Sequence, residues 1–210
     1  MQRTIFHRGG VIKVGTMLVS LLAWPVAGVA QDVSGQARVI QATVFGTTTT
    51  LADTGSLSAT DYAREASVLA GSISGLGGAE VLHATAVSPA VDSADAEASA
   101  GNLHLNLAGN NVGADFVMAR AASAGPALST IEGLTINGVP VAVSGAPNQT
   151  IPIGGGMVVL NEQKLSSSSV SVNAIHVVLY GLADVVIAHA DAGTSAPVSA
   201  LPLPGLPPLF

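Results

Sequence analysis

Four segments of the chain share one pattern of apolar and polar positions: alanine, a charged residue, two apolar residues, a variable residue and alanine. They are residues 37–44 (ARVIQATV), 79–86 (AEVLHATA), 114–121 (ADFVMARA) and 183–190 (ADVVIAHA). Because side chains alternate between the two faces of a β-strand, each segment predicts a strand with small alanines on one face. Their recurrence predicts a repeated β unit whose layers pack closely over alanine.

The fourth segment holds an aspartate and a histidine within an apolar run. Strict alternation predicts one face shared by Asp184, Val186, Ala188 and Ala190, with His189 on the opposite face. The two polar side chains are then not expected to act together. In the other segments the charge is expected at the rim of a sheet and the following residues inside: Arg38/Ile40/Ala42/Val44, Glu80/Leu82/Ala84/Ala86 and Asp115/Val117/Ala119/Ala121.

Turn residues between the apolar runs predict hairpins. Residues 65–78 and 97–111 each read as strand, Gly/Asn turn and strand, and Asn137-Gly138 is the best local turn signal in the chain. Two further strands are predicted at residues 156–163 and 169–181, joined by a serine-rich loop. A helix over residues 61–71 is the alternative for the first hairpin, because Ser58 and Asp61 offer a capping box.

The regular succession of short strands and turns predicts an all-β protein. We expect an antiparallel β-sandwich, jelly-roll-like and built from repeated hairpins. A β-solenoid is the alternative, because the four segments recur along the chain. The composition agrees with thin, closely packed layers, since hydrophobic residues make up 49% of the chain but aromatic residues only 3%.

The two ends of the chain differ in composition from its body. Residues 1–30 combine basic residues, a short apolar stretch and small residues before a cleavage point after Ala30, which predicts a secretory signal peptide. Residues 31–192 are then expected to form a β-rich extracellular domain. Residues 193–210 contain repeated prolines and predict a flexible tail, because proline does not fit a central strand.

Charge and cysteine content narrow the range of partners. All 13 acidic residues lie beyond residue 30, where only four basic residues remain, so nucleic acid is not an expected partner. An N-terminal membrane anchor is the alternative to the signal peptide, but its apolar stretch is shorter than the roughly 20 residues that a spanning helix needs. With the leader removed, no membrane span is expected in the mature chain. The chain has no cysteine, which excludes disulfides and thiolate metal sites. Self-association through edge strands, or contact with envelope or matrix components, is the expected interaction.

The body of the chain resembles the choice-of-anchor P family of secreted bacterial surface proteins. The resemblance covers about residues 33–191, and its most specific parts are PNQTIPIGGGMVVLNEQ (residues 147–163) and VNAIHVVL (residues 172–179). It implies an ectodomain that is shared among proteins with different C-terminal anchoring signals. It implies no defined biochemical activity and supplies no catalytic residues.

The end of the chain carries a second resemblance. ALPLPGLPPLF (residues 200–210) is similar to the opening of the VPLPA variety of PEP-CTERM sorting signals. Such signals continue into a spanning helix and an arginine cluster and imply processing by an exosortase. Because the sequence stops at Phe210, we expect either a truncated signal or a released protein.

Histidine is the first residue type to test for chemistry. No HxH or HExxH spacing occurs, and His83 and His189 occupy different places within the repeated segment, so we interpret the histidines as ordinary strand residues. The four beyond the leader are His83, His104, His176 and His189. A His83–His104 pair that binds Zn or Cu across neighbouring strands is the alternative, but it lacks an identifiable third ligand.

Acidic residues are the second type. Residues 92–97 (DSADAE) offer oxygen ligands for calcium but lack the glycine and distal glutamate of an EF-hand loop. We interpret this stretch as a solvated acidic loop, with weak calcium binding as the alternative. The acids expected in loops or at strand edges are Asp53, Asp61, Asp92, Asp95 and Glu97.

Glycine- and serine-rich stretches lack catalytic motifs. Residues 151–160 (IPIGGGMVVL) have neither the lysine of a P-loop nor the spacing of a dinucleotide site, so the glycines predict a turn or bulge at a close backbone approach. No serine lies in a GxSxG motif. Residues 148–150 (NQT) match a glycosylation sequon, but after Pro147 we interpret them as a turn. No catalytic, cofactor-binding or metal-binding residue is therefore predicted.

These observations favour a secreted or cell-surface structural or adhesive protein of undefined biochemical activity, such as a matrix or envelope component. An extracellular ligand-binding module for calcium or a glycan is the alternative. An enzyme is disfavoured, because no set of residues meets the geometric requirements of a catalytic site. The aromatic residues available in the body to stack on a sugar are few: Phe45, Tyr62, Phe116 and Tyr180.

Overall fold

The computed structural model describes residues 33–57, 61–90, 92–123 and 125–194. The predicted signal peptide at residues 1–30 lies outside the described residues, and so does the predicted tail from residue 195 onward. Gly193 and Thr194, which the proline pattern assigned to the tail, instead complete the last strand. No helix among the described residues is long and apolar enough to cross a membrane.

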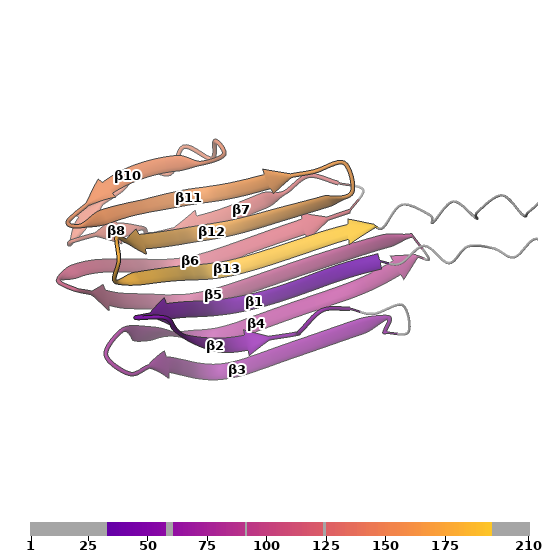
Figure 1. Ribbon diagram of the computed structural model, residues 1–210, viewed down its shortest axis with the longest axis horizontal. Helices are drawn as coiled ribbons and strands as arrows, with labels where there is room; N and C mark the ends of the chain where they lie inside the picture. The colour runs from indigo at the N-terminus through magenta and orange to yellow at the C-terminus, as the bar shows by residue number, and fades with distance from the viewer. Residues whose placement is uncertain (1–32, 58–60, 91, 124, 195–210) are drawn as a thin grey trace, which may run out of the picture.

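The described residues form two antiparallel sheets packed face to face, which confirms the predicted all-β sandwich (Figure 1). In spatial order, sheet A contains β10 (Gln149–Ile153), β11 (Gly156–Leu165), β12 (Ser169–Leu179), β13 (Ala183–Thr194), β1 (Val33–Val44) and β2 (Thr47–Asp53). Sheet B contains β3 (Ala63–Ile73), β4 (Gly77–Ala90), β5 (Ser93–Leu107), β6 (Asn110–Ala122), β8 (Thr135–Ile136) and β9 (Val139–Pro140), with β7 (Leu128–Glu132) also paired to β6.

The connections are those of a meander, because consecutive strands are neighbours within each sheet. The jelly-roll-like connectivity expected from the sequence is therefore not found, since a jelly roll requires Greek-key crossovers. β13 pairs with β1, so the first and last strands lie side by side. The alternatives of a solenoid and of a helix over residues 61–71 are both wrong, because the chain folds back in hairpins and β3 pairs with β4 along its whole length.

Several turns form where the sequence predicts them. Asn137 and Gly138 join β8 to β9 with φ values of 53° and 76°, the left-handed pair that a two-residue hairpin turn requires. Gly154 and Gly155 join β10 to β11, and a β-carbon on the adjacent Gly156 would collide with the carbonyl group of Val178. The predicted close backbone approach is therefore confirmed.

The strands of sheet A change their buried face at one level. In β13, Ile187 and Ala188 follow each other and both are fully buried, and the same is true of Val39 and Ile40 in β1. Arg38 pairs with His189 and Ile40 with Ile187, so Val39 lies opposite Ala188. The two changes of face therefore lie in one row across the sheet.

Left-handed backbone conformations continue this row to the neighbouring strands. Ala188 in β13 has a φ of 52°, Ala52 in β2 has 49° and Asn161 in β11 has 50°. The register places Ala52 opposite Val39, and Asn161 opposite Ala174, which is itself opposite Ala188. A residue in this conformation breaks the regular pleat, so that two neighbouring side chains point to the same side and the sheet bends.

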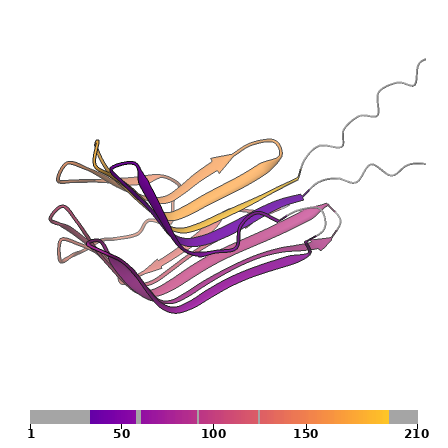
Figure 2. The same cartoon turned by 60° about the horizontal axis from the view of Figure 1, so that its bottom comes forward.

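Sheet B bends at a matching row, but its paired residues point outward. Leu69 and Ala70 in β3 are both exposed, as are Glu80 and Val81 in β4. Val81 carries a φ of 48°. The paired side chains point into the sandwich in sheet A and out of it in sheet B, so both sheets bend in the same sense. Figure 2 shows the two bent layers nested, with the outer face of sheet A on the concave side.

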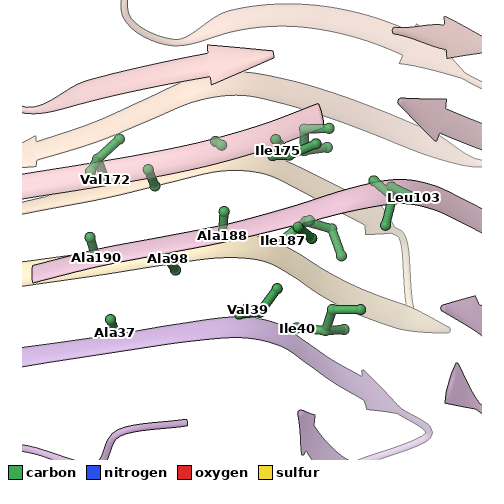
Figure 3. Close-up of a cluster of buried hydrophobic side chains, with 14 of the residues drawn as sticks. Ala37, Val39, Ile40, Ala98, Leu103, Val172, Ile175, Ile187, Ala188 and Ala190 are labelled. Atoms are coloured by element: carbon green, nitrogen blue, oxygen red, sulfur yellow. The ribbon is translucent and has the colours of Figure 1, made fainter. Parts of the chain in front are cut away.

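The bend divides the core into two arms with different side chains (Figure 3). The alanine arm is defined by the buried residues Ala37, Ala84, Ala86, Ala96, Ala98, Ala119, Ala121, Ala190 and Ala192. The aliphatic arm is defined by Ile40, Leu103, Leu105, Leu107, Val112, Leu160, Ile175, Val177, Leu179, Val185 and Ile187. The predicted packing over alanine is thus confirmed for one arm only.

The charged residues of three of the four repeated segments do not lie at a sheet rim; Asp184, the second residue of β13, does lie at a strand end. Arg38, Glu80 and Asp115 all lie within long strands, close to the bend, with their side chains on the outer faces. The residues that follow at intervals of two point inward, as expected. The predicted position of these three charged residues was wrong because the bend, rather than a strand end, lets their side chains turn away from the core.

Candidate functional site

Asp184 and His189 lie on the same face of β13, the outer face of sheet A, which contradicts the prediction from strict alternation. Ile187 and Ala188 are both buried, so the alternation is interrupted between the two polar residues. Val186 stays on the outer face with Asp184, whereas Ala188 and Ala190 point inward. The prediction failed because Ala188 adopts a left-handed conformation that alanine rarely adopts.

A chain of hydrogen bonds joins these two residues through side chains of the neighbouring strands. His189 Nδ1 lies 2.7 Å from Asn173 Oδ1, and Asn173 Nδ2 donates to Glu162 Oε2 at 2.6 Å. Glu162 Oε2 lies 2.9 Å from His176 Nδ1, and His176 Nε2 lies 3.2 Å from Asp184 Oδ1. We call these five residues the outer network; they come from β11, β12 and β13 and span the bend.

The local fold explains why these residues meet. Glu162 is directly opposite Asn173, and Asn173 is directly opposite His189, so three of them form one cross-strand row. Ala174 and Ile175 are both buried, so Asn173 and His176 are brought to the same outer face of β12. The bend therefore assembles the outer network.

His189 is held in its neutral form. Burial, together with the positive charge of Arg38, lowers the pKa of His189 from 6.5 to about 4. Because Asn173 donates its amide hydrogens to Glu162, its oxygen faces His189 and accepts the hydrogen bond from Nδ1–H. His189 therefore carries its proton on Nδ1 at neutral pH.

Glu162 is the ionised centre of the outer network. Burial alone would raise the pKa of Glu162, but the hydrogen bond from Asn173 and the positive charges of His176 and Lys164 outweigh it, so the pKa is lowered. His176 contacts Glu162 through one ring nitrogen and Asp184 through the other. His176 therefore bridges the two carboxylates.

A second polar group lies beside the network on β1 and β2. Gln36 Nε2 donates to Asp53 Oδ1 at 2.9 Å, and Arg38 Nε lies 3.7 Å from Asp53 Oδ2. The Arg38 Nε atom is buried and makes no hydrogen bond. Burial raises the pKa of Asp191, the cross-strand neighbour of Gln36, although Arg38 acts in the opposite sense. This group therefore combines a paired and an unfavourably buried carboxylate.

An open depression of about 380 Å³ lies at the turn end of the outer network. Asp184 borders it, and so does Phe45, whose side chain is 79% exposed. Phe45 has a φ of 48°, in the β1–β2 turn, and its N–H donates to the Leu182 carbonyl of the β12–β13 turn at 3.1 Å. The remaining residues that line the depression are Thr43, Gly46, Val178, Leu179, Gly181, Leu182 and Ala183.

The other histidines lie on sheet B and do not meet. His83 pairs with Ser99 of β5, whereas His104 of β5 pairs with Gly78, five residues away from His83 along β4. The alternative of a His83–His104 metal pair is therefore wrong. Across the described ranges, no group of three or more His, Cys, Asp or Glu side chains is placed to hold a metal ion.

Sequence inspection missed a serine–histidine–glutamate contact around His83. Ser67 Oγ lies 2.8 Å from His83 Nδ1, and the Glu65 carboxylate lies 3.7 Å from the same nitrogen. Ser67 Oγ also donates to Glu65 at 2.9 Å. In a catalytic triad the serine and the acid contact opposite nitrogens of the histidine. The contact on β3 and β4 does not have that arrangement.

Most of the acidic stretch at residues 92–97 is strand, and only Asp92 lies in the turn between β4 and β5. Asp95 and Glu97 lie within β5, where Asp95 Oδ2 is 3.7 Å from Arg120 Nη2. Their expected position in a solvated acidic loop is therefore wrong, because the strand alternation of β5 continues through both residues. The NQT stretch does form a turn at Asn148, whose φ is 61°.

Comparison of the chain with protein-family models, with curated proteins and with solved structures found no match. The resemblances to choice-of-anchor P proteins and to a sorting signal therefore stay predictions. The outer network itself is recognisable only after the register is known, because Glu162 and Asn173 belong to different strands and share no sequence motif.

Proposed function

We propose that this chain is a non-catalytic structural or adhesive protein of the cell surface or extracellular matrix. The observation that carries the proposal is the outer network. Its ionisable side chains bond to one another across β11, β12 and β13, and the depression beside it borders only Asp184 of the five. Such a pattern ties strands together along the sheet, which suits a load-bearing or binding surface.

Features of the sequence support a location outside the cell. Residues 1–30 have the composition of a signal peptide, and the body resembles secreted bacterial surface proteins. The acidic excess disfavours nucleic acid as a partner. An antiparallel sandwich without disulfides depends on its core and cross-strand contacts, which the outer network reinforces.

Surface exposure on intact native cells tests the proposal. An antibody raised against residues 33–194 is expected to label unbroken cells, and proteinase K added outside is expected to remove the signal while a cytosolic control protein survives. A strain that lacks the gene is expected to show reduced attachment or matrix cohesion. Recovery of the protein in the cytosol with residues 1–30 still attached would overturn the proposal.

Carbohydrate binding is a second candidate, favoured by the depression beside Asp184. Phe45 offers an exposed aromatic face at its border, and Asp184 offers a hydrogen-bond acceptor for hydroxyl groups. The left-handed backbone of Phe45 is an unfavourable conformation for a phenylalanine, and such strain is frequent at binding sites. The acidic surroundings favour a neutral sugar over a uronic acid.

Affinity electrophoresis in gels that contain hydroxyethylcellulose or dextran tests the second candidate. The wild-type chain is expected to be retarded by at least one polysaccharide, and both Phe45→Ala and Asp184→Asn are expected to lose the retardation. Tyr62→Ala is the matched control, because Tyr62 is 78% exposed and lies outside the depression. Wild-type mobility that is unchanged in both gels removes this candidate.

A further inference from the structure

Among the residues that the structure describes, strand β3 is a free edge of sheet B. It pairs with β4 on one side and is the last strand of its sheet, at the margin of the sandwich (Figure 1). Its 11 residues are mostly exposed. The backbone groups that face away from β4 are therefore available to another strand.

The middle of β3 lacks the features that usually protect an edge. Residues 66–72 (ASVLAGS) contain no charge and no proline, and Leu69 is 83% exposed. The charges of the strand, Arg64 and Glu65, lie at its beginning. A long, uncharged edge with an exposed aliphatic side chain favours pairing with another strand.

The other described edges are shorter or protected. β10 has five residues and contains Pro152, and β9 has two residues and ends at Pro140. β2 has seven residues and ends at Asp53, whose carboxylate is engaged by Gln36. Proline and charge both discourage pairing at an edge. β3 is therefore the edge best suited to a partner strand.

The bend determines which residues of β3 face which side. Ala66 and Ile73 pack against the core, and a β-carbon on Gly71 would touch Leu51 and Leu82. Val68 shares the inward face of its partner Leu82. Leu69 and Ala70 are both exposed, Ser67 contacts His83 on the outer face, and Ser72 lies between two inward residues.

We propose that β3 pairs antiparallel with β3 of a second copy, with Leu69 of each chain opposite Ala70 of the other. Opposed residues in a sheet must share a face. This register matches outward Ser67 with outward Ser72, inward Val68 with inward Gly71, and inward Ala66 with inward Ile73. A shift by one or two residues in either direction pairs an inward with an outward residue at the bend, so the bend selects one register.

The resulting contact joins two copies symmetrically. The two bends coincide, so sheet B continues across the pair and the exposed Leu69 side chains meet near the symmetry axis. Glu65 lies opposite Ser74 of the second copy, so no like charges face each other across the contact. The chemistry of the strand thus favours a second copy of this chain over a charged partner. Pairing through β3 would give the proposed structural protein a way to self-associate. The pairing rests on that proposed function only for its biological role.

Cysteine pairing tests the register, because the chain contains no cysteine of its own. Opposed residues of antiparallel strands have Cα atoms about 4.5–5.5 Å apart, a distance that a disulfide spans. Full-length Ser67→Cys and Ser72→Cys variants are mixed and mildly oxidised. The mixture is expected to form a disulfide-linked heterodimer, whereas either variant alone is expected to stay largely uncrosslinked. Ser167→Cys, an exposed serine in the β11–β12 loop, replaces Ser72→Cys in the control mixture.

Analytical ultracentrifugation provides the second measurement. The wild-type chain is expected to sediment at twice the monomer mass at high concentration, and Leu69→Lys is expected to sediment as a monomer. Leu165→Lys is the matched control, because Leu165 is 70% exposed but lies away from β3, and it is expected to keep the dimer. A monomeric wild type, or crosslinking equal to that of the Ser167→Cys mixture, would overturn the inference. Neither result depends on cell-surface location, so the two proposals can fail separately.

Discussion

The two arms of the bent sandwich fill the space between the sheets with different side chains. The alanine arm fills the space between its sheets mostly with single methyl groups, whereas the aliphatic arm uses leucine, isoleucine and valine. Both arms belong to the same long strands, such as β5, in which four buried alanines are followed by three buried leucines. Core volume therefore changes along a strand, and the bend marks the position of the change.

This difference predicts how much each arm contributes to stability and how each responds to substitution. A buried leucine or isoleucine removes much more apolar area from water than an alanine does, so the aliphatic arm is expected to supply most of the hydrophobic free energy. The alanine arm instead requires a close approach of the two sheets, because small side chains leave voids otherwise. The alanine arm is therefore expected to tolerate truncation of its side chains better, and their enlargement worse, than the aliphatic arm does.

Truncation of the aliphatic arm is expected to have the largest effect. Ile187→Ala removes a fully buried side chain next to the bend and leaves a cavity, so the free energy of unfolding is expected to fall by about 2–5 kcal/mol. Chemical denaturation monitored by circular dichroism measures this free energy of unfolding. Leu165→Ala removes an aliphatic side chain that is 70% exposed and is expected to change stability by less than about 0.5 kcal/mol. Equal losses in the two variants would contradict the assignment of the core to this arm.

The outer face adds a pH dependence that is specific to His189. The pKa of this residue falls from 6.5 to about 4 on folding, so the unfolded chain binds the proton first as the pH decreases. The stabilisation is complete above about pH 6.5 and is lost between pH 6.5 and 4, by roughly 3 kcal/mol at most. Denaturation at several pH values is expected to show a steeper loss for the wild type than for His189→Gln. Parallel pH profiles, or an NMR titration of His189 near pH 6.5, would contradict the burial argument.

The sequence predicted the strands and turns well, because these depend on local signals. Asn137-Gly138, the glycine-rich turn at residues 154–155 and the alanine pattern of the repeated segments all have direct local causes. The bend has no such signal, since Ala188 and Ala52 adopt left-handed conformations for which glycine or asparagine would be expected. Because the sequence does not predict the bend, strict alternation placed Asp184 and His189 on opposite faces of the strand. The outer network was therefore not predicted. Glu162 and Asn173 were missed because their proximity depends on strand register.

Enlargement of the alanine arm is expected to have an intermediate effect. Ala98 is fully buried, so Ala98→Leu forces the sheets apart and is expected to cost about 1–3 kcal/mol despite the added apolar area. Ala63→Leu adds the same atoms at an exposed position of β3 and is expected to be nearly neutral. Thermal unfolding of the two variants measures the difference. A more stable Ala98→Leu variant would show an unfilled cavity in this arm and remove the contrast between the arms.

The bend that separates the arms is expected to give the smallest effect, in the stabilising direction. Val81 is 62% exposed and has a φ of 48°, which is unfavourable for a β-branched residue, whereas Asn102 and Asn161 occupy comparable left-handed positions in β5 and β11. Val81→Asn is therefore expected to raise the free energy of unfolding by about 1 kcal/mol. Val87→Asn, elsewhere on β4 and without a left-handed φ, is expected to be neutral or destabilising, because asparagine is a poorer strand residue than valine. If both variants lose stability equally, backbone strain at Val81 does not contribute, and the bend must be held by the packing of the two arms alone.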